Sequence, residues 1–68
     1  MRPTLTVERD KLQDFAAGMA QFQVIPRTDL RVGERLPWKF ELNQGEAEVV
    51  YTRPEGNDKT FVVFKICR

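Results

Sequence analysis

Residues 60–66, TFVVFKI, constrain the fold most, because this short segment is apolar on both faces of a strand. Successive side chains of an extended chain point to opposite sides. Two hydrophobic residues therefore face one side and three the other: Phe61 and Val63 against Val62, Phe64 and Ile66. Such a strand has to be covered on both faces, which predicts a place in the middle of a sheet or a small barrel.

Four more segments have the features of strands. Residues 4–7 are β-branched and alternating, and Phe22 and Val24 form a short strand that ends at Pro26. The two other segments alternate with period two, as half-buried strands do. We expect their core-facing residues to be Trp38, Phe40 and Leu42 in one, and Ala47, Val49 and Tyr51 in the strand over residues 46–53. The turn residues in residues 43–45 and 54–58 separate these strands, and residues 28–37 have the punctuation of a loop.

A single helix is predicted over about residues 9–19. Apolar residues recur there at the helical spacing, with Gly18 near the end, where glycine commonly terminates a helix. The predicted apolar stripe consists of Leu12, Phe15, Ala16 and Met19.

The sequence thus predicts one α+β domain over residues 1–68, with element order β-α-β-loop-β-β-β. One helix would pack on a curled, mostly antiparallel five-stranded sheet or small open barrel. A chain of 68 residues buries only about 60% of its unfolded surface, so we expect a marginally stable monomer or homodimer.

Composition argues against most catalytic and metal-binding classes. The chain has no histidine and a single cysteine, Cys67, so the usual general base, zinc ligands and internal disulfides are missing. We therefore expect no enzymatic activity, metal or cofactor. The sequence has no apolar run long enough for a membrane span and no secretory signal, which predicts a cytoplasmic protein without membrane contact.

A basic loop and the strand after it form the candidate binding site. The predicted site residues are Arg27, Arg31, Arg35, Trp38 and Lys39. Arginine binds phosphate with a two-pronged hydrogen bond and indole stacks on bases, so the group suggests an RNA contact. The competing interpretation is that Asp29, Glu34 and Glu41 neutralise these cations, and that Trp38 belongs to the core.

The order of motifs over residues 4–36 resembles the ASCH and PUA-like superfamily of small β-barrels. The shared features are the strand TLTV, a helix ending near Gly18, the strand FQVIPR and the loop LRVGERL, in which Glu34 stands where the family has Asp. Members of this superfamily often bind RNA or modified nucleotides. Its catalytic members hydrolyse acetylated cytidine with Lys and Thr after the helix glycine and Glu on the next strand. This chain has Met or Ala, Gln or Phe, and Gln there, so the resemblance implies the fold and a ligand face without the chemistry.

Three hypotheses follow. The first is a non-enzymatic module that binds RNA or a nucleotide through the basic loop. The second is a small protein-binding adaptor or inhibitor of the kind that phages and other mobile elements encode, working through an edge strand or the same loop. The third is an enzyme that pairs Lys59 or Lys39 with Glu46 or Glu48.

Overall fold

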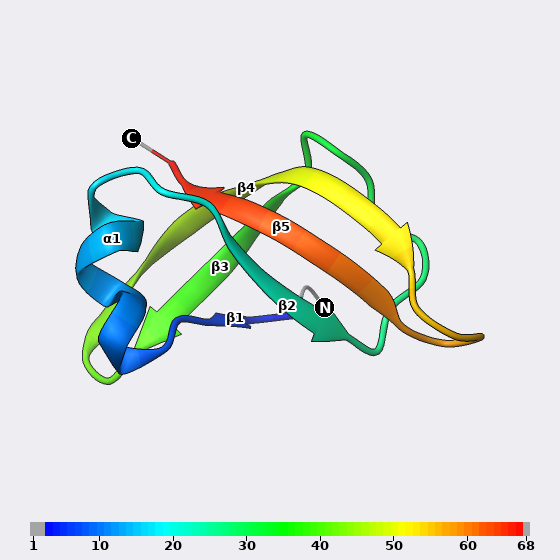
Figure 1. Ribbon diagram of the computed structural model, residues 1–68, viewed down its shortest axis with the longest axis horizontal. Coiled ribbons are helices and arrows are strands. Elements are labelled where there is room, and N and C mark those ends of the chain that lie inside the picture. The colour runs from blue at the N-terminus through cyan, green and yellow to red at the C-terminus, as the bar shows by residue number, and fades with distance from the viewer. Residues whose placement is uncertain (1–2, 68) are drawn as a thin grey trace.

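The computed structural model describes residues 3–67 and confirms the predicted order of elements. It shows one short helix and a five-stranded sheet, mixed but mostly antiparallel, that is nearly closed into a barrel (Figure 1). In chain order the elements are β1 (Leu5–Thr6), the 3₁₀ turn η1 (Arg9–Lys11), α1 (Leu12–Ala16), β2 (Gln21–Ile25), β3 (Arg35–Phe40), β4 (Asn43–Pro54) and β5 (Thr60–Ile66).

The strands lie in the order β1-β3-β4-β5-β2. β1 runs parallel to β3, and the other neighbouring pairs are antiparallel. β5 lies between β4 and β2, so it has a hydrogen-bonded neighbour on each side. The prediction of an interior strand, made from its two apolar faces, is confirmed.

A side chain links β1 and β2, which are the two edges of the sheet. The Thr6 N–H donates to Gln23 Oε1 over 2.8 Å. Backbone donors at a sheet edge need a partner, and here the glutamine amide supplies one across the seam of the barrel. The hydrogen bond thus connects the two edges of the nearly closed sheet, although β1 has only two residues.

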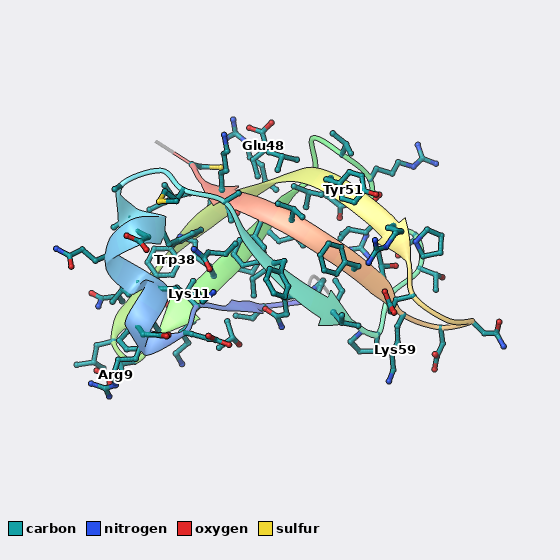
Figure 2. All side chains as sticks on the ribbon, in the orientation of Figure 1. Arg9, Lys11, Trp38, Glu48, Tyr51 and Lys59 are labelled. Atoms are coloured by element: carbon teal, nitrogen blue, oxygen red, sulfur yellow. The ribbon has the colours of Figure 1, made fainter. Side chains whose placement is uncertain are left out.

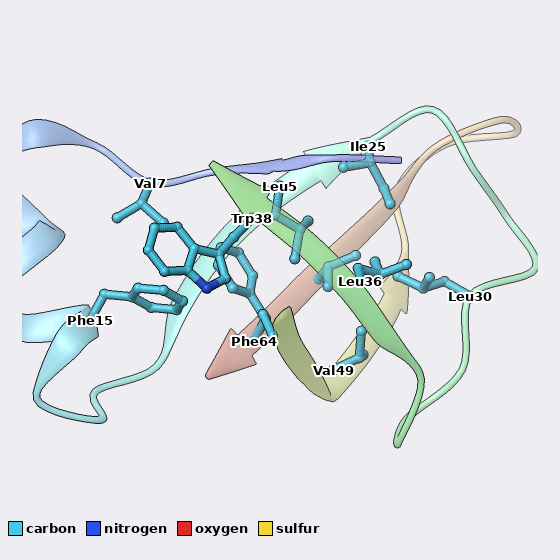
Figure 3. Close-up of a cluster of buried hydrophobic side chains, with 11 residues drawn as sticks. Leu5, Val7, Phe15, Ile25, Leu30, Leu36, Trp38, Val49 and Phe64 are labelled. Carbon is cyan, nitrogen blue, oxygen red and sulfur yellow. The ribbon is translucent and has the colours of Figure 1, made fainter. Parts of the chain in front are cut away.

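Phe15 of α1 is fully buried at the end of the core that lies beneath the helix (Figure 3). Its ring packs edge-on against Trp38 of β3 at a centroid distance of 5.2 Å and against Phe64 of β5 at 5.6 Å (Figure 3). Burial of a side chain of this size contributes about 1.5–3 kcal/mol. The other buried hydrophobic residues are Leu5, Val7, Ile25, Leu30, Leu36, Ala47, Val49 and Val62.

The helix is shorter than predicted. After the 3₁₀ turn, α1 makes little more than one turn before Gly18 ends it at φ 103°. The Gly18 N–H donates to the Phe15 carbonyl and the Met19 N–H to the Asp14 carbonyl, which is the Schellman arrangement. Of the predicted stripe, Phe15 is buried and Leu12 packs on the core, whereas Ala16, the last residue of α1, is exposed, and so is Met19, which lies beyond the helix.

The turn predicted at residues 43–45 is wrong, and so is the inward orientation of Leu42. Glu41 and Leu42 form the turn, with Glu41 at φ 52° and Leu42 fully exposed. Gly45 pairs with Trp38 inside the β3–β4 ladder. A Cβ at Gly45 would lie 2.9 Å from Trp38 Nε1, so this glycine permits the close approach of the indole instead of forming a turn.

Tyr51 also points away from the core, contrary to the prediction. Val49 pairs with Phe64 and Tyr51 pairs with Val63, so the register shifts by one residue at Val50. A β-bulge of this kind inserts one extra residue and reverses the alternation beyond it. Val49 is buried, whereas Tyr51 is 48% exposed on the outer side of the sheet.

Phe64→Ala is expected to unfold most of the domain. Removing a buried phenylalanine costs about 3–5 kcal/mol, which is comparable to the whole stability of about 3–5 kcal/mol expected for a core this small. Phe22→Ala is the matched control, because Phe22 is 63% exposed. Urea titration followed by circular dichroism measures both, and similar midpoints for the two variants would contradict the assigned core.

Gly45→Ala is expected to destabilise the protein by about 1–3 kcal/mol, as overpacking does, despite the intrinsic gain of about 0.5–1 kcal/mol for replacing a strand glycine. The new methyl group would meet the indole of Trp38, which Phe15 holds in place. Trp38→Phe removes the atoms that clash. The cost of Gly45→Ala should therefore shrink in a Trp38→Phe background, and an equal cost in both backgrounds would disprove the contact.

Candidate functional site

Trp38, one of the five predicted site residues, lies in the core. Only 8% of the Trp38 surface is exposed (Figures 2 and 3). Its ring packs against the ring of Phe15 and lies close to the Cα of Gly45. A base needs an open ring face for stacking. The proposed stacking role of Trp38 is therefore corrected: the inward alternation of β3 places the indole among hydrophobic residues.

Arg27 is held by two acids of its own loop. Its Nε lies 2.5 Å from Asp29 Oδ1, and its Nη2 lies 2.8 Å from Glu34 Oε2. The hydrogen bond with Asp29 is the main cause that raises the pKa of Arg27 and lowers the pKa of Asp29. The Arg27 carbonyl in turn accepts a hydrogen bond from Thr60 Oγ1. Arg27 thus connects the acids of the loop, through its side chain, with Thr60 of β5, through its carbonyl group.

The rest of the basic loop follows β4. The Gly33 N–H donates to the Val49 carbonyl over 2.8 Å, and the Val49 N–H donates to the Glu34 carbonyl over 2.9 Å. Leu30 is buried beneath the loop, while Arg31 is exposed. The loop ends at Glu34, because β3 already begins at Arg35 instead of after Pro37. This segment closes one end of the barrel.

Arg35 and Lys39 lie on the outer side of β3, among acidic and amide side chains of β4. Arg35 pairs in register with Glu48, and Lys39 pairs with Gln44. Lys39 also lines an open hollow of about 490 Å³ together with Glu46. The structure therefore brings Arg35 and Lys39 onto one strand face but keeps Arg27 in its own ion pairs. The five residues do not converge on one surface.

The two lysines suggested for acid–base chemistry, Lys39 and Lys59, lie in different places. Lys59 precedes β5 near the β4–β5 turn, well away from Glu48 (Figure 2). Lys39 and Glu46 line the same hollow. Within residues 3–67, no group of three or more histidine, cysteine or acidic residues is arranged to hold a metal ion, and no helix is long and apolar enough to cross a membrane.

Sequence reasoning missed a group of aromatic rings on the outer side of β2, β5 and β4. Phe22 and Phe61 stack with centroids 5.4 Å apart and an interplanar angle of 26°. Tyr51 meets Phe61 edge-on at 6.5 Å. Phe22 is 63% exposed and Tyr51 is 48% exposed. We call this surface the aromatic face, and it consists of Phe22, Val24, Tyr51, Phe61 and Val63.

Two cations lie over the rings of the aromatic face. The Arg53 guanidinium carbon is 4.6 Å from the Phe61 centroid, and Lys11 Nζ is 5.9 Å from the Phe22 centroid. These distances fall within the range of cation–π attraction. Arg53 reaches Phe61 because the two residues pair in the β4–β5 ladder beyond the bulge. The outer side of the barrel thus combines exposed rings with positive charge.

The sequence contained part of the signal for this surface. Phe61 and Val63 were recognised as a second apolar face, and Phe22 and Val24 alternate with glutamines on the strand that pairs with them. The missing information was the bulge at Val50, which turns Tyr51 to the same side. Exposed apolar patches on small soluble domains commonly mark binding surfaces.

Neither a scan against protein-family models nor searches of curated proteins and of solved structures gave a significant match to this chain. The resemblance to the ASCH and PUA-like superfamily therefore stays a prediction.

Asp29→Asn is expected to destabilise the protein at neutral pH and to have a smaller effect in acid. The pKa of Asp29 is lower in the folded than in the unfolded chain, because Arg27 donates to the ionised carboxylate. The stabilisation is complete above the unfolded pKa and is lost as the pH falls through the lowered, folded pKa. Urea titrations of both proteins across the acid range should show their unfolding free energies converge. A constant difference would show that Asp29 acts through something other than its charge.

Proposed function

We propose that this chain is a non-enzymatic binding module that holds single-stranded RNA on the aromatic face. The observation that supports it is the set of three adjoining rings on neighbouring strands, two of them about half exposed or more. Single-stranded nucleic acids bind β-sheets through bases that stack on such rings, at about 1–3 kcal/mol per base. The basic loop, the surface first expected to bind, has its Arg27 engaged by acids and its neighbouring indole buried.

The position of the cations supports the same ligand class. Arg53 and Lys11 each lie over a ring, so a base stacked nearby would place its phosphate close to a positive charge. The resemblance to the ASCH and PUA-like superfamily, whose members often bind RNA or modified nucleotides, favours this ligand as well. With a net charge of only +1, the chain must take its affinity mainly from stacking.

A protein-binding adaptor or inhibitor is the second candidate, and one observation favours it. Val63 lies between Tyr51 and Phe22 in the sheet, and Val24, which pairs with Phe61, is 45% exposed. Aliphatic side chains add little to base stacking, but they are ordinary components of protein interfaces. Both candidates use the aromatic face, so they differ in ligand and not in location.

Phe22→Ala and Tyr51→Ala are each expected to weaken binding of single-stranded RNA by about 5- to 150-fold, the loss of one stacked base. Fluorescence anisotropy with a labelled RNA of about ten nucleotides, within the site size of small β-folds, measures the affinity. Leu42→Ala is the matched control, because Leu42 is fully exposed in the β3–β4 turn and is not part of the aromatic face. The logarithm of the affinity should fall with the logarithm of salt concentration at a slope of about −1.4 for two phosphate contacts.

The double variant Arg31→Ala, Arg35→Ala distinguishes the aromatic face from the basic loop. We expect it to bind RNA as the wild type does. If it abolishes binding while Phe22→Ala and Tyr51→Ala have no effect, the loop is the binding surface and the proposal is wrong. If no RNA binds, but a nuclease-treated lysate yields a protein partner that Phe22→Ala loses, the adaptor hypothesis replaces it.

A further inference from the structure

A hollow of about 240 Å³ lies at the end of the barrel, where the β4–β5 turn meets the loop after β2. It is lined by Thr28, Leu30, Thr52, Arg53, Pro54, Gly56, Asn57, Lys59 and Thr60. Within the described part of the chain, none of these lining residues is acidic. Two other hollows each combine a cation with a carboxylate: Lys11 with Glu8 in one, and Lys39 with Glu46 in the other.

The polar side chains around this hollow can donate several hydrogen bonds. Arg53 and Lys59 supply charged N–H groups, and Thr28 and Thr52 supply hydroxyls. Thr60 Oγ1 already donates to the Arg27 carbonyl, so it ties the wall to the anchored loop. A lining with two cations, several neutral donors and no acid matches the chemistry of a phosphate group.

The β4–β5 turn positions the two cations. The Glu55 N–H donates to the Lys59 carbonyl over 2.9 Å and closes the turn, in which Gly56 adopts φ 78°. This closure brings Lys59 back beside the strand that carries Arg53. The two side chains differ in a useful way: the guanidinium offers a planar fork for two phosphate oxygens, and the ammonium acts as a compact charge.

We propose that this hollow binds a phosphate group, and specifically the phosphate of a nucleotide whose base lies on the aromatic face beside Phe61. This inference rests on the proposed function, because Arg53 connects the two places. Arg53 lines the hollow, and its guanidinium carbon lies 4.6 Å from the Phe61 centroid. A nucleotide on the aromatic face would thus direct its phosphate over the β4–β5 end of the sheet.

Glu55 is the competitor for Arg53. Its Oε2 lies 3.6 Å from Arg53 Nη2, longer than the about 2.7–2.9 Å of a strong charged hydrogen bond. Both side chains are about half exposed, and exposed ion pairs of this kind are weak. An incoming phosphate would displace the carboxylate, so removing the charge of Glu55 should strengthen phosphate binding.

The test uses inorganic phosphate and two RNA oligonucleotides, one with a 5′-phosphate and one with a 5′-hydroxyl. Inorganic phosphate should shift the amide resonances of Thr28, Thr52 and Lys59 in NMR spectra. Lys59→Gln should weaken RNA binding about tenfold, the loss expected for a hydrogen bond to a charged group. Glu55→Gln should strengthen it up to about fivefold. Lys39→Gln is the matched control, since it removes a cation from the hollow that contains Glu46.

The outcomes separate this inference from the proposed function. If Lys59→Gln affects only the 5′-phosphorylated RNA, the hollow holds a terminal phosphate; if it affects both RNAs equally, the hollow holds a phosphate within the chain. If RNA binding responds to Phe22→Ala but Lys59→Gln behaves like Lys39→Gln, and inorganic phosphate shifts no resonance, the hollow is not a phosphate site while the proposed function stands. If phosphate shifts these resonances but no RNA binds, the phosphate site stands without its nucleotide, and the link to the aromatic face is wrong.

Discussion

The packing of Phe15 against Trp38 and Phe64 is the interaction on which the rest of the structure depends. It joins the helix to β3 and β5, two strands that are separated by β4 in the sheet. The ring packs against both strands on the inner side of the curled sheet. The same curl brings the β1 and β2 edges near enough for the Gln23–Thr6 hydrogen bond. The outer side of β2, β5 and β4 thereby becomes a convex surface whose side chains have no part in the core.

The alternation of apolar and polar residues predicted which segments form strands. It did not predict turn positions and strand register where these depend on contacts between residues that are far apart in the sequence. The interior position of β5 followed from its two apolar faces. The β3–β4 turn was misplaced because glycine is a common turn residue. Gly45 instead lies within the β3–β4 ladder, where the absence of a side chain leaves room for the indole of Trp38. The bulge at Val50 depends on pairing with β5, and the three consecutive apolar residues Val49, Val50 and Tyr51 break the alternation of β4 without fixing the register beyond the break.

The candidate site was harder to predict for a similar reason. The number of cations in the loop does not tell which acids they pair with, and Arg27 forms ion pairs with Asp29 and Glu34. The alternation of β3 already favoured a buried Trp38, and the structure agrees with that competing interpretation. The aromatic face has contributions from three strands, β2, β4 and β5. Its rings became neighbours only through the register of the whole sheet, which single-sequence patterns do not specify.

Arg53 determines how the aromatic face and the neighbouring hollow would work together. A long, exposed arginine normally loses considerable side-chain entropy when it binds a phosphate. Here the guanidinium already rests over Phe61, and this contact is worth about 0.5–1 kcal/mol at an exposed site. Part of the ordering cost is thus met before a ligand arrives, while the long ion pair with Glu55 keeps the charge from being fully neutralised. Affinity would then come from a few preorganised groups, which explains how a chain of net charge +1 could bind an anionic ligand without a broad basic surface.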